Sequence, residues 1–204
     1  MVTEADVSRW LLKATESYRV ALRDEIAVAE VASPCLRRSY FSRTRVAPPS
    51  PIEFLKTVGS EVHLKLAEVL RAEGCEVEVS VGLQLGGFKL CGRVDALCRE
   101  KDGEVVIEFK TVSELPEQPY ESHLLQVQAY LLMLKLERGY LVYLSRTTGR
   151  VRVFRVLRNG RALKQLVERA KQLHEALVRS SPPPPERGPW CRDCPFTVLC
   201  RWGR

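Results

Sequence analysis

The sequence predicts an α/β fold in which helices flank a mixed central sheet. Segments with apolar residues at helical spacing alternate with segments that have strand character, in the order helix, helix, strands, helix, strands, helix. The chain has 204 residues, of which 45% are hydrophobic. A chain of this length and composition can bury one well-packed core, so we expect one domain with small additions.

The N-terminal part is predicted to be helical. Residues 3–30 carry an apolar stripe at helical spacing, and prolines at 48–51 then interrupt the chain. A second helix should begin at Ser50-Pro51-Ile52-Glu53, because Ser can cap a helix, Pro suits the first helical position and Glu completes a capping box. It should end near Gly74, a natural C-cap.

The remaining elements follow from strand, turn and helix signals. They are strands at 76–81, 88–98 and 104–111, a helix at 120–138, a hairpin of 140–145 with 151–157, and a helix at 161–179. A proline-rich linker and a cysteine-containing tail come last. We therefore expect an N-terminal helical segment at 1–50, a core at 51–180, and a linker with its tail at 181–204.

The charge balance favours a polyanionic partner. Lys and Arg number 32 against 25 Asp and Glu, which gives a net charge of +7. Basic side chains bind phosphates by releasing counterions, although a solvated basic face is the alternative. We predict phosphate contacts for one basic segment in particular, formed by Arg37, Arg38, Arg43 and Arg45.

The compartment is predicted to be the cytoplasm. The first residues show no basic and apolar regions of a signal peptide, and no stretch approaches the roughly 20 apolar residues that span a bilayer. The scarcity of Asn and Met and the dense charge are typical of a thermophile.

Two carboxylates and a lysine lie inside otherwise apolar strands. If the turn between the second and third strands is Asp102-Gly103, Asp95 opposes Lys110 and Leu97 opposes Glu108. Side chains alternate with period two, so Asp95, Glu108 and Lys110 would then share one face of the sheet. A different turn length would change this register.

Such a pair of carboxylates predicts a metal site. Like charges 4 Å apart repel by about 4 kcal/mol at an effective dielectric constant near 20, and a bound divalent cation reverses the sign. Oxygen ligands suit magnesium or manganese, and a nearby lysine can activate water. A surface edge with a salt-bridged lysine is the alternative.

These residues resemble a known nuclease core. Gly92-Arg93-Val94-Asp95, followed by Glu108-Phe109-Lys110, resembles the Asp…Glu-x-Lys core of the PD-(D/E)XK nucleases. Gln126-Val127-Gln128-Ala129-Tyr130 is similar to the Gln-x3-Tyr motif of their RecB-like branch, and Gly59-Ser60-Glu61-Val62-His63 is similar to its helical histidine motif. Without the resemblance, the Gln reads as a surface residue, the Tyr as a core residue and the His as structural.

The resemblance implies a role for each residue. Asp95, Glu108, the backbone carbonyl of Phe109 and His63 would hold manganese or magnesium. Lys110 would position or deprotonate water. The last two residues of the set, Gln126 and Tyr130, would position the DNA strand or the lysine.

Seven cysteines are present, and four of them have the pattern of a thiolate site. Cys191, Cys194 and Cys200 lie in the tail, and Cys35 lies near the N-terminus. Four thiolates suit either zinc or an iron–sulfur cluster, and the spacing does not choose between them. We expect the other three, Cys75, Cys91 and Cys98, to be small apolar packing residues.

One N-terminal cysteine with a C-terminal Cys-x2-Cys-x5-Cys around a RecB-like core resembles the iron–sulfur nucleases, and in a chain this short the CRISPR-associated RecB-like exonucleases ("Cas four"). One departure is Leu36, where that family usually has proline after its first cysteine. The resemblance implies a cluster on these four cysteines, of four irons rather than two. It also implies trimming of single-stranded or frayed DNA ends in CRISPR spacer acquisition, with the CRISPR integrase and its companion subunit as partners.

Three alternatives stay open. They are the nuclease domain of a helicase–nuclease repair system, a non-catalytic zinc or iron–sulfur DNA-binding module, and a redox-sensing regulator that binds DNA without cutting it.

Overall fold

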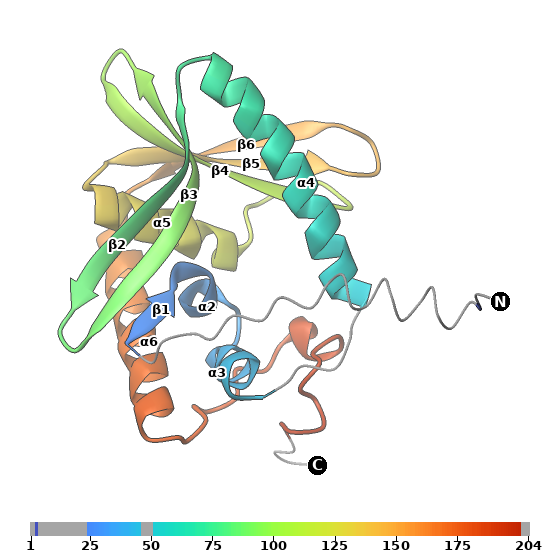
Figure 1. Cartoon of the computed structure of the whole chain (residues 1–204), viewed down its shortest axis with the longest axis vertical. Helices are drawn as coiled ribbons and strands as arrows, with labels where there is room; N and C mark the ends of the chain where they lie inside the picture. Colours follow the sequence, from blue (N-terminus) through green and yellow to red (C-terminus); the bar gives the residue numbers. More distant parts are fainter. Residues whose placement is uncertain (1–2, 4–23, 46–50, 201–204) are drawn as a thin grey trace.

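The structure is a computed structural model that describes Thr3 and residues 24–45 and 51–200 of the chain (Figure 1). Six strands form one mixed sheet: β1 Glu25–Ala27, β2 Glu76–Leu85, β3 Phe88–Glu100, β4 Gly103–Val112, β5 Arg138–Ser145 and β6 Val151–Leu157. The helices are α2 Val28–Ala32, α3 Leu36–Thr44, α4 Pro51–Ala72, α5 Glu121–Leu134, α6 Gly160–Val178 and the 3-10 helix η1 Pro189–Cys191. The predicted α/β class with a mixed central sheet is confirmed.

The sheet has a fork at its centre. Its order is β1-β3-β4-β5-β6, and β2 pairs with β3 as well. The first part of β3 pairs in parallel with β1 at Lys89–Cys91, whereas the last part pairs antiparallel with β4 at Ala96–Glu100. In Figure 1, β2 and β3 accordingly run away from β4 and β5 below the point where they cross. The middle of β3 is therefore where two halves of the sheet separate.

Two apolar clusters hold the sheet between helices. The large cluster joins residues of α2, α5 and α6 to the strands, among them Val28, Leu131 and Leu166. The small one joins Leu70 of α4 to Ala96, Cys98 and Val105. Helix α4 lies apart from α5 and α6 in Figure 1. The sheet is thus covered by three helices through the large core and by α4 through the small one.

The long N-terminal helix predicted for residues 3–30 is wrong in its last part. Residues Glu25–Ala27 form β1, which pairs with β3, and the described helix α2 begins only at Val28. Tertiary pairing with β3 overrides the helical periodicity there, because Ile26 is fully buried in the large core. Residues 4–23 lie outside the described part of the chain.

Helix α4 follows the prediction closely. It starts at Pro51 and ends in a Schellman motif, in which Cys75 N–H donates to the Leu70 carbonyl at 3.0 Å and Gly74 N–H to Arg71 at 3.1 Å. Gly74 has the left-handed φ of 86° that this motif requires.

Helix α5 ends earlier than predicted. Lys135 takes the left-handed conformation with φ 56°, and the helix stops at Leu134 instead of Gly139. Gly139 has another use inside β5, because a Cβ there would lie 2.9 Å from the Val106 carbonyl oxygen of β4. The glycine permits close strand approach and does not cap the helix.

The register predicted for β3 and β4 is wrong by two residues. The turn is Lys101-Asp102, with Glu100 opposite Gly103 and Leu97 opposite Val106. A shift of two leaves the alternation of faces unchanged. The paired ladder ends at Ala96 and Ile107, before it reaches Asp95.

Two of the cysteines assigned to apolar packing form a disulfide instead. Cys75 and Cys98 are bonded, and their Cα atoms lie 4.4 Å apart. The pairing of Glu76 with Leu97 places them opposite each other. The bond joins the end of α4 to β3. Cys91 remains a free, half-buried thiol, and burial raises its pKa, which fits a packing residue.

None of the helices in the described residues is long and apolar enough to cross a membrane.

The disulfide generates a stability prediction. Its partners are 23 residues apart, and cross-linking a loop of that size restrains the unfolded chain by about 3 kcal/mol. Cys75→Ser should therefore lower the free energy of unfolding by about that amount, measured by urea denaturation. Reductant should destabilise the wild type to the level of the variant and leave the variant unchanged. Equal stability of oxidised wild type and variant would contradict the bond.

Candidate active site and cysteine cavity

The candidate active site lies in the fork between β3 and β4. Beyond the end of the ladder, the Asp95 carboxylate replaces a strand carbonyl as acceptor and accepts the Phe109 N–H at 2.7 Å. The carboxylate thus satisfies a strand amide that the partner strand no longer reaches. This contact fixes Asp95 at the point where the two strands separate.

Strand β2, which pairs with the other edge of β3, is distorted at the level of Asp95. Glu78 of β2 has a left-handed φ of 55°. On one side of it Val77 packs into the small core, and on the other side Val79 packs against the large core. The β2–β3 ribbon therefore changes the face that it buries at this level. A non-glycine residue in this conformation carries backbone strain, which is common at functional sites.

Glu108 is the most unusual charged residue of the site. Its side chain is 2% exposed, and burial raises the pKa of Glu108 to about 7, although the neighbouring Lys110 ammonium lowers it. Its Oε1 accepts a hydrogen bond from Lys110 Nζ at 2.7 Å. Its Oε2 is buried and has no hydrogen-bond partner among the described residues. A buried carboxylate oxygen without a partner is costly and indicates a place for a cation.

Lys110 is held by a chain of hydrogen bonds that leads back to β3. Its Nζ also donates to Gln126 Oε1 at 2.8 Å, and Gln126 Nε2 donates to the Tyr130 hydroxyl at 3.0 Å. That hydroxyl donates to the Arg93 carbonyl at 2.9 Å. Burial raises the pKa of Tyr130 above its usual range, so it remains a hydroxyl donor. One turn of α5 thus ties the lysine to the strand that carries Asp95.

Gly92 gives the Tyr130 ring its space. A Cβ at Gly92 would lie 2.7 Å from Tyr130 Cε1 and 3.0 Å from Val28 Cγ2. Any side chain there would push the ring, and the hydroxyl it carries, away from β3. The glycine before Asp95 is therefore required by packing against α5.

His63 reaches the site from α4. Its Nδ1 lies 3.6 Å from Asp95 Oδ1, and its ring stands edge-on to the Phe109 ring with centroids 6.3 Å apart. One turn earlier, a Cβ at Gly59 would lie 2.8 Å from Thr111 Oγ1. This close approach of α4 to β4 sets the height at which His63 meets the carboxylate.

The residues present fit a hard divalent cation. Two carboxylates and an imidazole lie together, and Glu108 Oε2 has no other partner. Within the described part of the chain, no three His, Cys, Asp or Glu side chains already converge on one point. Glu108 and Asp95 are engaged with Lys110 and the Phe109 amide, so cation binding would require their carboxylates to turn.

The four cysteines predicted to act together line one cavity. Cys35, Cys191, Cys194 and Cys200 are free thiols that border a cavity of about 370 Å³. Its charged lining consists of one glutamate and three arginines: Glu186, Arg37, Arg38 and Arg187. Four thiolates with a metal centre are anionic, and a positive lining favours them. Four free thiols around one cavity fit either zinc or an iron–sulfur cluster.

Comparison with known proteins decides the family. The chain matches the sequence profile of the PD-(D/E)XK nuclease superfamily over residues 9–201. The chain belongs to this superfamily. It is also 31% identical over 164 residues to the CRISPR-associated exonuclease Cas4 of Saccharolobus solfataricus, a match that covers 77% of the chain and 74% of the relative. The chain therefore belongs to the family of that exonuclease as well.

Solved structures agree on the fold of this nuclease. The crystal structure of SSO0001 superposes with a TM-score of 0.70 at 28% identity and covers 96% of each chain. An alkaline exonuclease (LHK-Exo) from Laribacter hongkongensis reaches a TM-score of 0.50 at 12% identity, over 84% of this chain and 95% of the other, and supports the fold alone. The family and fold implied by the sequence motifs are confirmed.

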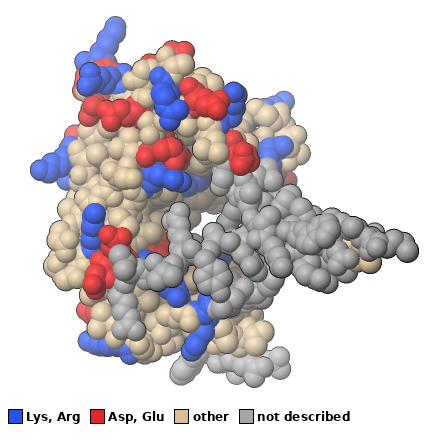
Figure 2. All heavy atoms as spheres, viewed as in Figure 1, with Lys and Arg blue, Asp and Glu red and all other residues tan. Residues whose placement is uncertain are grey.

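The basic segment of this nuclease is only partly available to a partner. Arg37 is buried and donates to the Pro183 carbonyl at 2.6 Å, and Arg43 pairs with Glu30 at 2.5 Å. The prediction that both contact phosphates is wrong, because they hold the fold together. Arg38 is half-buried, and Arg45 is exposed. On the face shown in Figure 2, basic and acidic side chains of the described residues are interspersed instead of forming one basic field.

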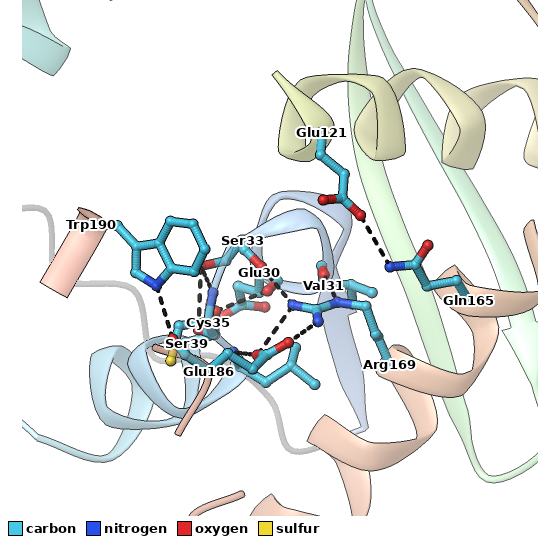
Figure 3. A network of polar contacts seen from close by, with 11 residues as sticks. Glu30, Val31, Ser33, Cys35, Ser39, Glu121, Gln165, Arg169, Glu186 and Trp190 are labelled. Atoms are coloured by element: carbon cyan, nitrogen blue, oxygen red, sulfur yellow. Dashed lines mark hydrogen bonds and ion pairs between the residues drawn. The ribbon is translucent and has the colours of Figure 1, made fainter. Parts of the chain in front are cut away.

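One set of residues at the cavity was missed from the sequence. Arg169 of α6 pairs with Glu186, which follows the proline-rich linker (Figure 3). No motif marks either residue, and both read as solvated charges at the surface. The disulfide was missed for a different reason. The sequence contains the signal that would have predicted it, the turn Gly86-Gly87, but this turn was not used to align the two strands. A hairpin centred on Gly86-Gly87 places Cys75 opposite Cys98.

A half-buried histidine next to the site generates a pH prediction. Burial and, less strongly, the Lys110 charge lower the pKa of His123 to about 3, and its Nδ1 lies 2.9 Å from the Tyr143 hydroxyl. The unfolded chain takes up a proton below about pH 6.5, while the folded chain stays neutral there until about pH 3. Stability is therefore lost as pH falls, by up to about 1.4 kcal/mol per pH unit.

His123→Gln should flatten the loss of unfolding free energy between pH 6 and pH 4 relative to the wild type. The measurement is urea denaturation at several pH values, with NMR titration of the histidine as a direct check. A His123 that gains its proton near pH 6.5 in the folded protein would contradict the prediction.

Proposed function

We propose that this chain is a metal-dependent exonuclease that hydrolyses phosphodiester bonds at single-stranded or frayed DNA ends. The observation that carries the proposal is the buried Glu108, whose Oε2 has no partner within the part of the chain that the structure describes, while Asp95 and Lys110 lie beside it. A module that only binds DNA would have no use for a carboxylate buried at this expense of solvation. Membership of the nuclease superfamily supports the same conclusion.

The residues divide into a cation-holding set and a water-activating set. Asp95, Glu108, the Phe109 carbonyl and His63 would hold manganese or magnesium. When bound, the cation supplies positive charge to the phosphate under attack and lowers the pKa of bound water. If Glu108 gave up its contact with Lys110 to hold the cation, Lys110 would have a donor position to offer to water.

Gln126 and Tyr130 act through Lys110. Gln126 Oε1 keeps the ammonium in place, and Tyr130 anchors Gln126 to the Arg93 carbonyl. A lysine held by packed neighbours loses little entropy when it orients water or donates to the developing charge on phosphate. These two are positioning residues in this proposal, and contact with the DNA strand is not needed for their role.

We place the reaction in CRISPR spacer acquisition in the cytoplasm. The relative at 31% identity is named a CRISPR-associated exonuclease, and this supports the assignment. The partners would be the CRISPR integrase and its companion subunit, to which trimmed ends would pass.

We propose further that Cys35, Cys191, Cys194 and Cys200 hold an iron–sulfur cluster, with four irons favoured over two. The support is the cavity that these four thiols border and its arginine-rich lining. Zinc is the alternative, and iron and sulfide analysis of anaerobically purified protein separates the two. The cluster's role would be structural, because its ligands join distant segments of the chain.

The cleavage machinery can be tested with a matched pair of lysines. Lys110→Ala should lower the manganese-dependent rate on end-labelled single-stranded DNA by about 10² to 10⁴-fold, since it removes the group that activates water. Lys101→Ala, in the exposed β3–β4 turn, should retain the wild-type rate. Glu108→Ala and Asp95→Ala should match Lys110→Ala, and His63→Ala should lose less. Wild-type rates in Lys110→Ala and Glu108→Ala together would exclude these residues as the active site.

The cluster can be tested with a matched pair of cysteines. Cys35→Ser should lose most of its iron and its brown colour and melt at a substantially lower temperature, because one of four thiolates and the link to the tail disappear. Cys75→Ser removes a disulfide-bonded cysteine outside the cavity and should keep its iron. A Cys35→Ser protein with full iron content would show that another ligand completes the site.

A further inference from the structure

A polar clasp joins three distant segments beside the cysteine cavity (Figure 3). Arg169 projects from α6 toward the segment between α2 and α3. Its Nε donates to the Val31 carbonyl at 2.9 Å, and its Nη2 donates to the Ser33 carbonyl at 2.6 Å. Its Nη1 forms an ion pair with Glu186. The guanidinium thus uses its fork geometry to join a helix, a loop and the tail.

Glu186 connects this clasp to the first turn of α3. Its Oε2 accepts the Leu36 N–H at 2.6 Å, and Leu36 directly follows Cys35. Its backbone carbonyl accepts Trp190 Nε1 at 2.9 Å, and Trp190 directly precedes Cys191. One residue therefore touches the neighbours of a cluster cysteine on each side of the cavity.

A second contact runs parallel to the first. Arg37 is buried and donates from Nε to the Pro183 carbonyl at 2.6 Å. Pro183 belongs to the proline-rich linker, whose restricted backbone carries the chain from the end of α6 to Glu186. None of these contacts uses a cysteine thiol. The position of Cys35 relative to the tail is therefore set by groups other than the metal ligands.

We propose that Glu186 is a positioning residue that shapes the four-thiol cavity for cluster loading. The inference rests on the proposed cluster. Bringing Cys35 and Cys191 together closes a long loop, and this is unfavourable in entropy. The clasp offsets that loss before any iron binds, so incoming iron meets thiols already in place. The same carboxylate also accepts an amide of the first turn of α3, where a negative charge is favourable.

The test compares two Glu→Gln variants of the full chain. Glu186→Gln keeps the size of the side chain but removes the charge that pairs with Arg169. Glu121→Gln is the control, because among the described residues the Glu121 side chain of α5 makes a single exposed contact, of 3.4 Å, with Gln165 of α6, the helix that carries Arg169 (Figure 3). Cluster-free protein is incubated anaerobically with ferrous iron and sulfide. The growth of charge-transfer absorbance and the iron bound per chain are followed.

Glu186→Gln should load about tenfold more slowly than the wild type, as expected when a charge-assisted contact is lost. Glu121→Gln should load at the wild-type rate. Arg169→Lys, which keeps a positive charge but loses the fork to Val31 and Ser33, should fall between. If Glu186→Gln is poorly folded before loading, Arg169→Lys carries the same comparison.

Melting temperatures separate a loading role from a general structural one. Glu186→Gln should melt clearly below the wild type in cluster-free form and close to it once loaded, since the cluster then supplies the link. Equal loading rates, or an equal drop of melting temperature in both forms, would overturn the inference. A wild type that binds no iron would overturn the cluster assignment itself, while leaving the proposal for Asp95, Glu108 and Lys110 untouched.

Discussion

The separation of β3 from β4 at Asp95 is the constraint on which the rest of the site depends. A continuous ladder would satisfy the Phe109 amide with a strand carbonyl and leave no opening between the strands. Because the ladder ends, a carboxylate satisfies that amide, and polar side chains gather in the middle of an apolar sheet. The left-handed Glu78 and the change of buried face in β2 are the local adjustments that permit it.

The neighbouring helices are adapted to this separation of β3 from β4. Helix α5 closes one side with the chain from Lys110 to Tyr130, and Gly92 makes room for the ring. Helix α4 closes the other side with His63, at a height set by Gly59. The buried Glu108 lies between them. Its raised pKa reflects a position that favours a proton or a cation over a bare charge. The fold thus holds buried negative charge that is poorly solvated, and a bound divalent ion would neutralise it.

The sequence was informative where chemistry and local geometry coincide. Motif spacing identified Asp95, Glu108 and Lys110, and helix-end signals located α4 to within two residues of its end. It failed where distant segments decide the outcome. The helical stripe before Val28 gave way to pairing of Ile26 beside β3. Gly139 resembled a helix cap, but it serves a close strand approach. Arg37 contacts Pro183, and Arg169 contacts Val31 and Ser33, in each case more than a hundred residues away, so no local pattern indicates that these arginines are internal.

The disulfide between Cys75 and Cys98 has a consequence for how α4 can move. It fixes the C-terminal end of the helix to β3, while His63 lies nine residues before that end at Ala72, about 14 Å along the axis at 1.5 Å per residue. A displacement of the helix from the sheet is then a swing about a covalent pivot. The distance from this pivot grows toward the N-terminal end of the helix, so any such displacement would be smallest at Ala72 and largest at Pro51.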